Sequence, residues 1–189
     1  MTVRVARVFA LVFACAIAAS PSDTRAEPVD TKRLPQATLD TLKQSFVMPE
    51  VLSLVSASSN RSASKAYLQA RQTRFKFMET QKQGPMVVDG YSVQDMASPI
   101  IGYSLFYHSD NGPLVIADAS VNPIQKDAVA GISKLIAASL DSISNPDGSK
   151  MYFLGIHDLD SSRVLKIMVR AASTPMGPDY ALRYAVSDR

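Results

Sequence analysis

Residues 99–124 read PIIGYSLFYHSDNGPLVIADASVNPI, and this stretch decides the predicted fold. Two apolar runs, 99–108 and 113–120, flank the polar segment 109–112. Aspartate, asparagine and glycine favour tight turns, because they hydrogen-bond to nearby backbone or tolerate unusual backbone angles. Two apolar runs joined by such a segment are typical of a β-hairpin. The stretch therefore predicts two antiparallel strands.

A helix and three further strands are predicted after the hairpin. Asn122 and Pro123 indicate a helix start, because asparagine caps free N–H groups and proline fits the first turn. Apolar residues at helical spacing extend this helix to residue 143. The remaining apolar runs predict strands over residues 150–157, 163–171 and 179–187.

Before the hairpin, the sequence favours helices and one short strand. Apolar residues recur at helical spacing over residues 39–46, 51–55 and 64–81, and the Gly-Pro pair at 84–85 ends the last helix. A short strand is predicted over residues 86–91. No internal repeat interrupts this order.

These elements predict an α+β domain. Its mainly antiparallel sheet of about five strands would consist of the hairpin, a crossover helix and a three-strand meander, with the N-terminal helices packed on it. This order is similar to that of profilin-like and roadblock-like folds, which carry many unrelated activities. We expect a single domain over 27–189, with a helical part at 27–85 and the sheet at 86–189.

The first 26 residues have the layout of a secretory signal peptide. Arg4 and Arg7 precede an apolar run of twelve residues, Val8–Ala19, which is shorter than the ~20 residues that span a bilayer. Small residues around Ala26 suit cleavage by a signal peptidase. We therefore expect an exported chain, periplasmic or secreted, that begins at Glu27 and has no transmembrane segment.

Cys15 is the only cysteine and lies within the apolar run. Cleavage after Ala26 removes it, so the mature chain would contain no disulfide and no cysteine-ligated metal. The alternative is that Cys15 is a lipid-attachment site, because the residues before it loosely resemble a bacterial lipobox.

The mature chain is nearly neutral. Without residues 1–26, three of the 20 basic and one of the 17 acidic residues are lost, which leaves a net charge of +1. Export and this small charge give no reason to expect a nucleic-acid partner. The one locally basic segment contains the candidate binding residues Lys65, Arg71, Arg74 and Lys76. On the predicted helix 64–81 these cations would line a surface for a protein partner or an anionic component of the envelope.

Residues 155–164 read GIHDLDSSRV and contain the candidate catalytic residues His157, Asp158 and Asp160. Imidazole and carboxylate groups serve in acid–base chemistry and bind metals. Strand side chains alternate between faces, so His157 and Asp158 would diverge. The stretch is therefore interpreted as a hairpin loop, in which Arg163 pairs with Asp158 or Asp160. A sharp bend at Asp158 would reopen the catalytic interpretation.

The other histidine, His108, is expected too far away to complete a site. The strand 150–157 is predicted to run parallel to 113–120 and antiparallel to 99–108. His108 and His157 would then lie at opposite rims of the sheet. We expect no metal and no cofactor.

The sequence favours an exported, non-enzymatic binding or accessory protein, bacterial and periplasmic, that contacts a protein or a small ligand. One alternative is a small envelope hydrolase or metal-dependent enzyme that uses His157, Asp158 and Asp160. Another is a lipid-anchored component of an envelope secretion or transfer assembly, which requires Cys15. The sequence leaves the partner and the oligomeric state open.

Overall fold

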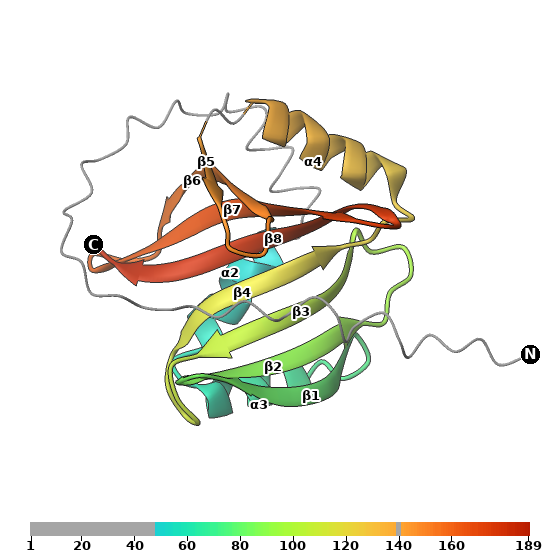
Figure 1. Cartoon of the computed structure of the whole chain (residues 1–189). Coiled ribbons are helices and arrows are strands. Elements are labelled where there is room, and N and C mark those ends of the chain that lie inside the picture. Colours follow the sequence, from blue (N-terminus) through green and yellow to red (C-terminus); the bar gives the residue numbers. More distant parts are fainter. Residues whose placement is uncertain (1–47, 139–140) are drawn as a thin grey trace, which may run out of the picture.

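Eight strands form one antiparallel sheet in the computed structural model, which describes residues 48–138 and 141–189 (Figure 1). The described helices are α2 (Met48–Ala57), α3 (Arg61–Gln69) and α4 (Lys126–Ala138). The strands are β1 (Phe75–Gln83), β2 (Met86–Val93), β3 (Ile100–Tyr107), β4 (Leu114–Val121), β5 (Ser142–Ser144), β6 (Lys150–Asp158), β7 (Arg163–Thr174) and β8 (Gly177–Asp188). Their order across the sheet is β1-β2-β3-β4-β8-β7-β6-β5.

The predicted hairpin is present as β3 and β4. Leu105 faces Ala117 across this pair, and Tyr103 faces Ala119. All four side chains are buried on the same face, because cross-strand partners in an antiparallel pair point to the same side. This alternation gives the hairpin the apolar face on which the core is built.

The described helices pack against this face. In Figure 1, α2 and α3 lie behind β1–β4, and α4 lies beside β7 and β8. One core cluster joins residues from all three helices to the sheet: Val51 and Leu54 from α2, Leu68 from α3, and Ile132 and Leu135 from α4. The helices therefore share one core with both halves of the sheet.

The strands β4 and β8 join the two halves of the sheet. Ala119 faces Leu182 and Ala117 faces Tyr184 across this pair, and all four are buried. On the other face, Arg183 Nε donates a hydrogen bond of 2.7 Å to Asp118 Oδ1. This junction is closed by apolar packing on one face and by an ion pair on the other.

The predicted five-strand α+β fold, with its similarity to profilin-like and roadblock-like folds, is wrong. The described chain forms eight antiparallel strands, and the order is two helices, four strands, one helix and four strands. The two strands that the sequence did not predict are β1 and β5. Both lie at edges of the sheet, where a strand is paired on one side only and its apolar pattern is weak.

The predicted helix over 64–81 is also wrong in its second half. The helix α3 ends at Gln69, and β1 begins at Phe75. Phe75 and Phe77 face Val93 and Tyr91 of β2, so pairing with β2 outweighs the helical spacing of the apolar residues. Similarly, α4 ends at Ala138, and the last predicted helical residues, 142 and 143, belong to β5.

Some predictions lie outside the described residues, namely the signal peptide, the role of Cys15 and the helix over 39–46. Within residues 48–138 and 141–189, no helix is long and apolar enough to cross a membrane. These residues also contain no cysteine, so no disulfide links them.

Candidate functional site

The helix α3 and the edge strand β1 lie side by side and present a joint surface. Lys65 Nζ lies 5.4 Å from the centroid of the Phe77 ring, and the Phe75 N–H donates a hydrogen bond of 2.9 Å to the Arg71 carbonyl. We call this the α3–β1 surface, and its residues are Lys65, Tyr67, Arg71 and Phe77. Its chemistry comes from two elements that meet only in the folded chain.

One large apolar side chain, Phe77, is exposed on the α3–β1 surface, with an exposed fraction of 47%. Met78 is 50% exposed but lies on the other face of β1, because its Cβ is 3.9 Å from the place of a Cβ at Gly90, whereas Phe77 packs against Tyr91. On the same surface as Phe77, the Arg71 guanidinium stacks over the Tyr67 ring, 3.8 Å from its centroid. Aromatic residues, methionine and arginine are enriched in the centres of protein–protein interfaces. The α3–β1 surface therefore has the composition of a protein-binding surface.

The backbone of β1 is poorly suited to accept an added strand. Met78 lies at a register shift between Phe77 and Glu79, which marks a β-bulge. Lysines lie on both sides of it, at positions 76 and 82. Bulges and lysines are common features of sheet edges that do not pair with other chains. A partner at this edge would therefore contact the side chains rather than extend the sheet.

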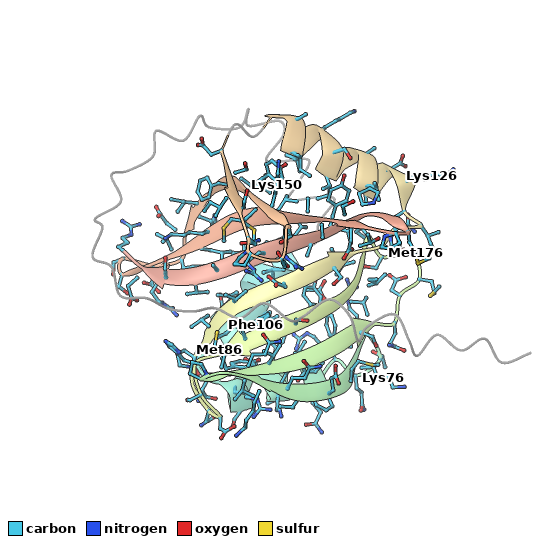
Figure 2. The ribbon with its side chains drawn as sticks, in the orientation of Figure 1. Lys76, Met86, Phe106, Lys126, Lys150 and Met176 are labelled. Atoms are coloured by element: carbon cyan, nitrogen blue, oxygen red, sulfur yellow. The ribbon has the colours of Figure 1, made fainter. Side chains whose placement is uncertain are left out.

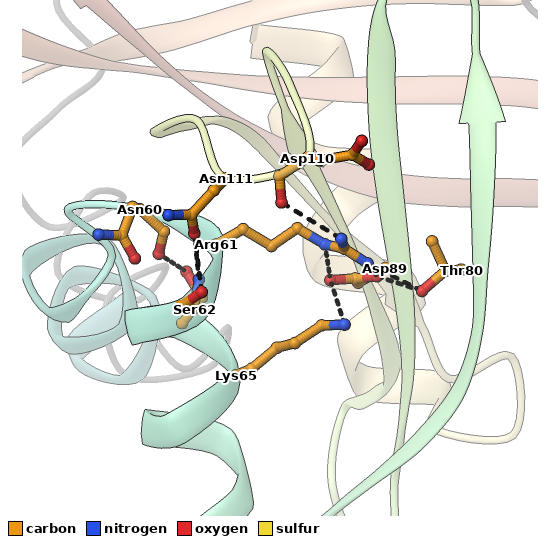
Figure 3. Close-up of polar contacts among 9 residues, drawn as sticks. Asn60, Arg61, Ser62, Lys65, Thr80, Asp89, Asp110 and Asn111 are labelled. Atoms are coloured by element: carbon orange, nitrogen blue, oxygen red, sulfur yellow. Dashed lines mark hydrogen bonds and ion pairs between the residues drawn. The ribbon is translucent and has the colours of Figure 1, made fainter.

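A buried ion pair holds α3 onto the sheet beneath this surface (Figure 3). Arg61 donates two hydrogen bonds to the Asp89 carboxylate, of 2.7 Å from Nε and 2.6 Å from Nη2. Thr80 Oγ1 donates a third to Asp89 at 2.6 Å, and Lys65 Nζ lies 3.7 Å from the same carboxylate. Asp89 is fully buried. Its charge is therefore satisfied within the fold, and the cluster positions α3 against β1 and β2.

The surroundings of Asp89 keep this carboxyl group ionised. Burial raises the pKa of Asp89, but hydrogen bonds from Arg61 and Thr80 and the charges of Arg61 and Lys65 lower it further than burial raises it. The pKa therefore lies below the usual value of aspartate. A group held in the ionised form by two cations is suited to a structural role rather than to proton transfer.

The loop between β3 and β4 braces the start of α3. Asn60 Oδ1 accepts a hydrogen bond of 2.9 Å from the Ala63 N–H, which caps the helix. The Asn111 side chain accepts a hydrogen bond of 2.7 Å from the Ser62 hydroxyl, and Arg61 Nη1 donates one of 3.3 Å to the Asp110 carbonyl. The helix is therefore fixed at the rim where β3 ends.

The four predicted binding cations do not lie on one helix. Lys65 lies on α3 and Arg71 in the turn after it, and both contribute to the α3–β1 surface. Arg74 also precedes β1, and its guanidinium makes two hydrogen bonds of 3.0 Å to Glu50 of α2. Lys76 is an exposed residue of β1. The structure therefore brings Lys65 to Phe77 and Arg71 to Tyr67, while Arg74 is engaged by an internal carboxylate.

The segment GIHDLDSSRV forms the end of β6, a turn and the start of β7. Asp160 accepts hydrogen bonds from the Ser162 N–H at 2.9 Å and from Arg163 Nε at 2.8 Å. These bonds, the one from Ser162 foremost, lower the pKa of Asp160. Asp158 instead pairs with Arg189 at 2.7 Å. The predicted pairing of Arg163 with an aspartate is present, and the turn uses both carboxylates in local contacts.

His157 points away from these aspartates. It faces the buried Leu165 across the β6–β7 pair and is itself half-buried, whereas Asp158 is exposed. The three predicted catalytic residues are therefore not brought together around one point. Among the described residues, no three His, Cys, Asp or Glu side chains could hold a metal ion.

The predicted placement of the two histidines at opposite rims is wrong. Because every neighbouring pair in the sheet is antiparallel, β6 runs parallel to β3 and antiparallel to β4. His108 directly follows β3 and His157 lies near the end of β6, so both are at the same rim. Three strands separate β3 from β6, so at about 4.8 Å per strand the two ends lie about 19 Å apart. The two histidines are therefore separated by distance along one rim and do not lie at opposite rims.

The exposed Phe77 was missed because the sequence predicts a helix over residues 64–81. One available signal was the Gly-Pro pair at 84–85, which separates two runs of similar length and is typical of a hairpin turn. Gly84 has a φ of 58°, as such a turn requires. With β1 recognised as a strand, alternation would have placed Phe75 and Phe77 on one face.

Comparison with protein-family models, with curated protein sequences and with solved structures finds no significant match to this chain.

Proposed function

We propose that the mature chain is an exported, non-enzymatic binding or accessory protein whose α3–β1 surface contacts a partner protein. The observation that carries this proposal is the exposure of about half of the Phe77 side chain, which lies under Lys65, on a surface that also holds the Arg71–Tyr67 stack. Exposed aromatic side chains next to cations combine apolar contact area with charge. The structural role of Asp89 and the separation of the two histidines favour this function over catalysis.

Charge favours an acidic partner. Residues 61–83 contain six basic residues and one acidic residue, whereas the whole chain has a net charge of only +3. Asp89 pairs with Arg61 and Lys65, Glu50 pairs with Arg74, and Asp110 pairs with Lys82. Arg71 and Lys76 are the two cations left, and both are exposed. We propose a partner segment that carries an apolar side chain flanked by carboxylates.

Site-specific photo-crosslinking tests the proposal. A benzophenone amino acid at position 77, in the cells that naturally produce the protein, is expected to give one discrete protein adduct. Charge reversal by Arg71→Glu should reduce the adduct, because the change places a carboxylate opposite an acidic partner. The purified partner should then bind the Phe77→Ala variant about tenfold or more weakly, as expected for an aromatic residue at the centre of an interface.

The matched control places the benzophenone at position 143, an exposed isoleucine on β5 at the opposite edge of the sheet. An adduct of equal yield at both positions, or one that the charge reversal leaves unchanged, would contradict the proposal. N-terminal mass spectrometry of the same sample tests export, for which we expect a chain that begins at Glu27. An intact N-terminus would refute that part of the proposal.

A further inference from the structure

The Lys65 ammonium is held between the buried Asp89 carboxylate and the exposed Phe77 ring. Its Nζ lies 3.7 Å from Asp89 Oδ2 and 5.4 Å from the centroid of the ring. These two neighbours limit the positions of a long side chain, so part of the entropy that binding would cost is already lost. The Lys65 side chain is nevertheless 41% exposed. It is therefore both oriented and accessible.

The hydrogen-bond donors of this ammonium are not used by the described part of the fold. Asp89 accepts its hydrogen bonds from Arg61 and Thr80, at 2.6 to 2.7 Å. Lys65 lies too far from the carboxylate for a charge-assisted hydrogen bond, which is about 2.7–2.9 Å long. Within residues 48–138 and 141–189, Lys65 Nζ donates to no other group. Its three N–H donors therefore remain for a ligand.

The cluster around Asp89 has a surplus of positive charge. It contains two cations, Arg61 and Lys65, and one carboxylate, and no second described carboxylate pairs with either cation. Arg61 makes two hydrogen bonds to Asp89, and its side chain is only 13% exposed. The surplus charge is therefore presented to solvent by the more exposed Lys65, beside the Phe77 ring.

Lys76 cannot take the place of Lys65, although it is the sequence neighbour of Phe77. Lys76 faces Ser92 across the β1–β2 pair, whereas Phe77 faces Tyr91. Successive side chains of a strand point to opposite faces, so the Lys76 side chain points away from the face that carries the ring. Figure 2 shows Lys76 and Met86 at opposite ends of the β1–β2 hairpin. Lys76 is therefore an exposed lysine close in sequence but on the other face.

The Phe77 ring is fixed as well. It packs edge-on against the buried Tyr91 ring, with the centroids 5.5 Å apart and the planes at 70°. The side chain is still 47% exposed. An oriented cation and an oriented ring thus lie side by side. This arrangement fits a ligand in which a carboxylate is close to an apolar group.

We infer that Lys65 binds a carboxylate of the partner protein and that this carboxylate lies directly beside the apolar side chain that packs on Phe77. The ammonium donates hydrogen bonds to the carboxylate, and the apolar group covers the exposed part of the ring. This inference rests on the proposed function, because it names the contact by which the same surface recognises its partner.

Small probes test this inference on the purified chain without the partner. Phenylacetate carries a carboxylate close to a ring, and phenylacetamide has the same shape without the charge. We expect NMR titration to place phenylacetate next to the Phe77 ring and the Lys65 side chain. Its affinity should be at least about threefold higher than that of phenylacetamide, as for an ion pair at a partly exposed site. Inorganic phosphate should bind more weakly than phenylacetate, because it offers no apolar group to the ring.

Substitutions identify the cation that binds the probe. Lys65→Gln should weaken phenylacetate binding at least about threefold and leave phenylacetamide binding unchanged, because only the charge is lost. Lys65→Arg should preserve the preference for phenylacetate, since a guanidinium keeps the charge and the donors. Lys76→Gln is the matched control and should change neither affinity. Equal affinity for the two probes, an unaffected Lys65→Gln variant, or phosphate binding as tight as that of phenylacetate would overturn the inference.

The inference and the proposed function fail separately. If Lys65→Gln leaves the photo-crosslinked adduct at position 77 unchanged, the inference is wrong and the proposed function stands. If position 77 gives no adduct but phenylacetate binds in a manner that depends on Lys65, the partner protein is refuted and the carboxylate contact remains.

Discussion

At the scale of single residues, the buried Asp89 carboxylate is the most sensitive point of the fold. Asp89→Ala would leave the Arg61 guanidinium, only 13% exposed, without its counter-charge. Removing one partner of a buried ion pair typically costs about 3–5 kcal/mol. We expect urea unfolding to show a loss of this size. Asp158→Ala is the control, and it should have a much smaller effect because its pair with Arg189 is exposed. Equal effects would refute the structural role of Asp89.

The same carboxylate gives the stability a pH dependence whose sign follows from its pKa. Because the folded-state pKa of Asp89 lies below that of the unfolded chain, its ionised form stabilises the fold above about pH 3.9, the usual value for aspartate. This contribution is lost as the pH falls through the folded-state pKa. Asp89→Asn should therefore show a flatter decline of unfolding free energy below pH 4 than the natural chain. Parallel declines would show that other carboxylates dominate.

At the scale of elements, the β1–β2 hairpin depends on one glycine. Gly84 has a φ of 58°, and a Cβ added there would meet no atom within 4 Å. Gly84→Ala should therefore cost about 1–2 kcal/mol from the left-handed backbone alone. Gly155→Ala is the matched control, because a Cβ at Gly155 also meets nothing but its φ is ordinary. It should be neutral or slightly stabilising. Thermal unfolding measures both, and equal effects would contradict the turn geometry.

Elements with local signals were predicted well. The strands β2, β3, β4, β6, β7 and β8 lie within a few residues of their predicted positions, as does α2, and α4 lies inside its longer predicted range. In each of these strands, the alternation of apolar and polar residues and the flanking turn residues indicate the structure. These signals lie within about ten residues of sequence. The segment that became β1 gave a conflicting signal, since its apolar residues fit a helix, and only pairing with β2 decides between the two.

At the scale of the whole molecule, β4 and β8 connect both halves of the sheet around one core. Leu182 is 1% exposed and faces Ala119 and Val169. Leu182→Ala should cost about 2–5 kcal/mol, since it leaves a cavity at this junction. Far-ultraviolet circular dichroism and tyrosine fluorescence should still give one coincident unfolding transition in urea. Two separated transitions would show that the halves unfold independently. Ile143→Ala, at an exposed position, should change the stability by less than about 0.5 kcal/mol.

The candidate surface was only partly predictable. Lys65 and Arg71 were identified from local charge, but the segment that contains Phe77 was predicted to continue the same helix. Asp89, which orients Lys65, lies on β2, and no local pattern shows that this strand meets α3. Their proximity follows from contacts between segments that are far apart in the sequence.

The sequence by itself determined the central hairpin, the later strands, the helix α4 and the turn at Asp160, because each depends on residues close together in the chain. The tertiary structure alone decided that β1 is a strand, that β8 returns to pair with β4, and that His108 and His157 share a rim at a distance. These outcomes depend on which distant segments bury one another's apolar faces. The alternation of apolar and polar residues within a strand specifies its buried face, but it does not specify which other strand pairs with it.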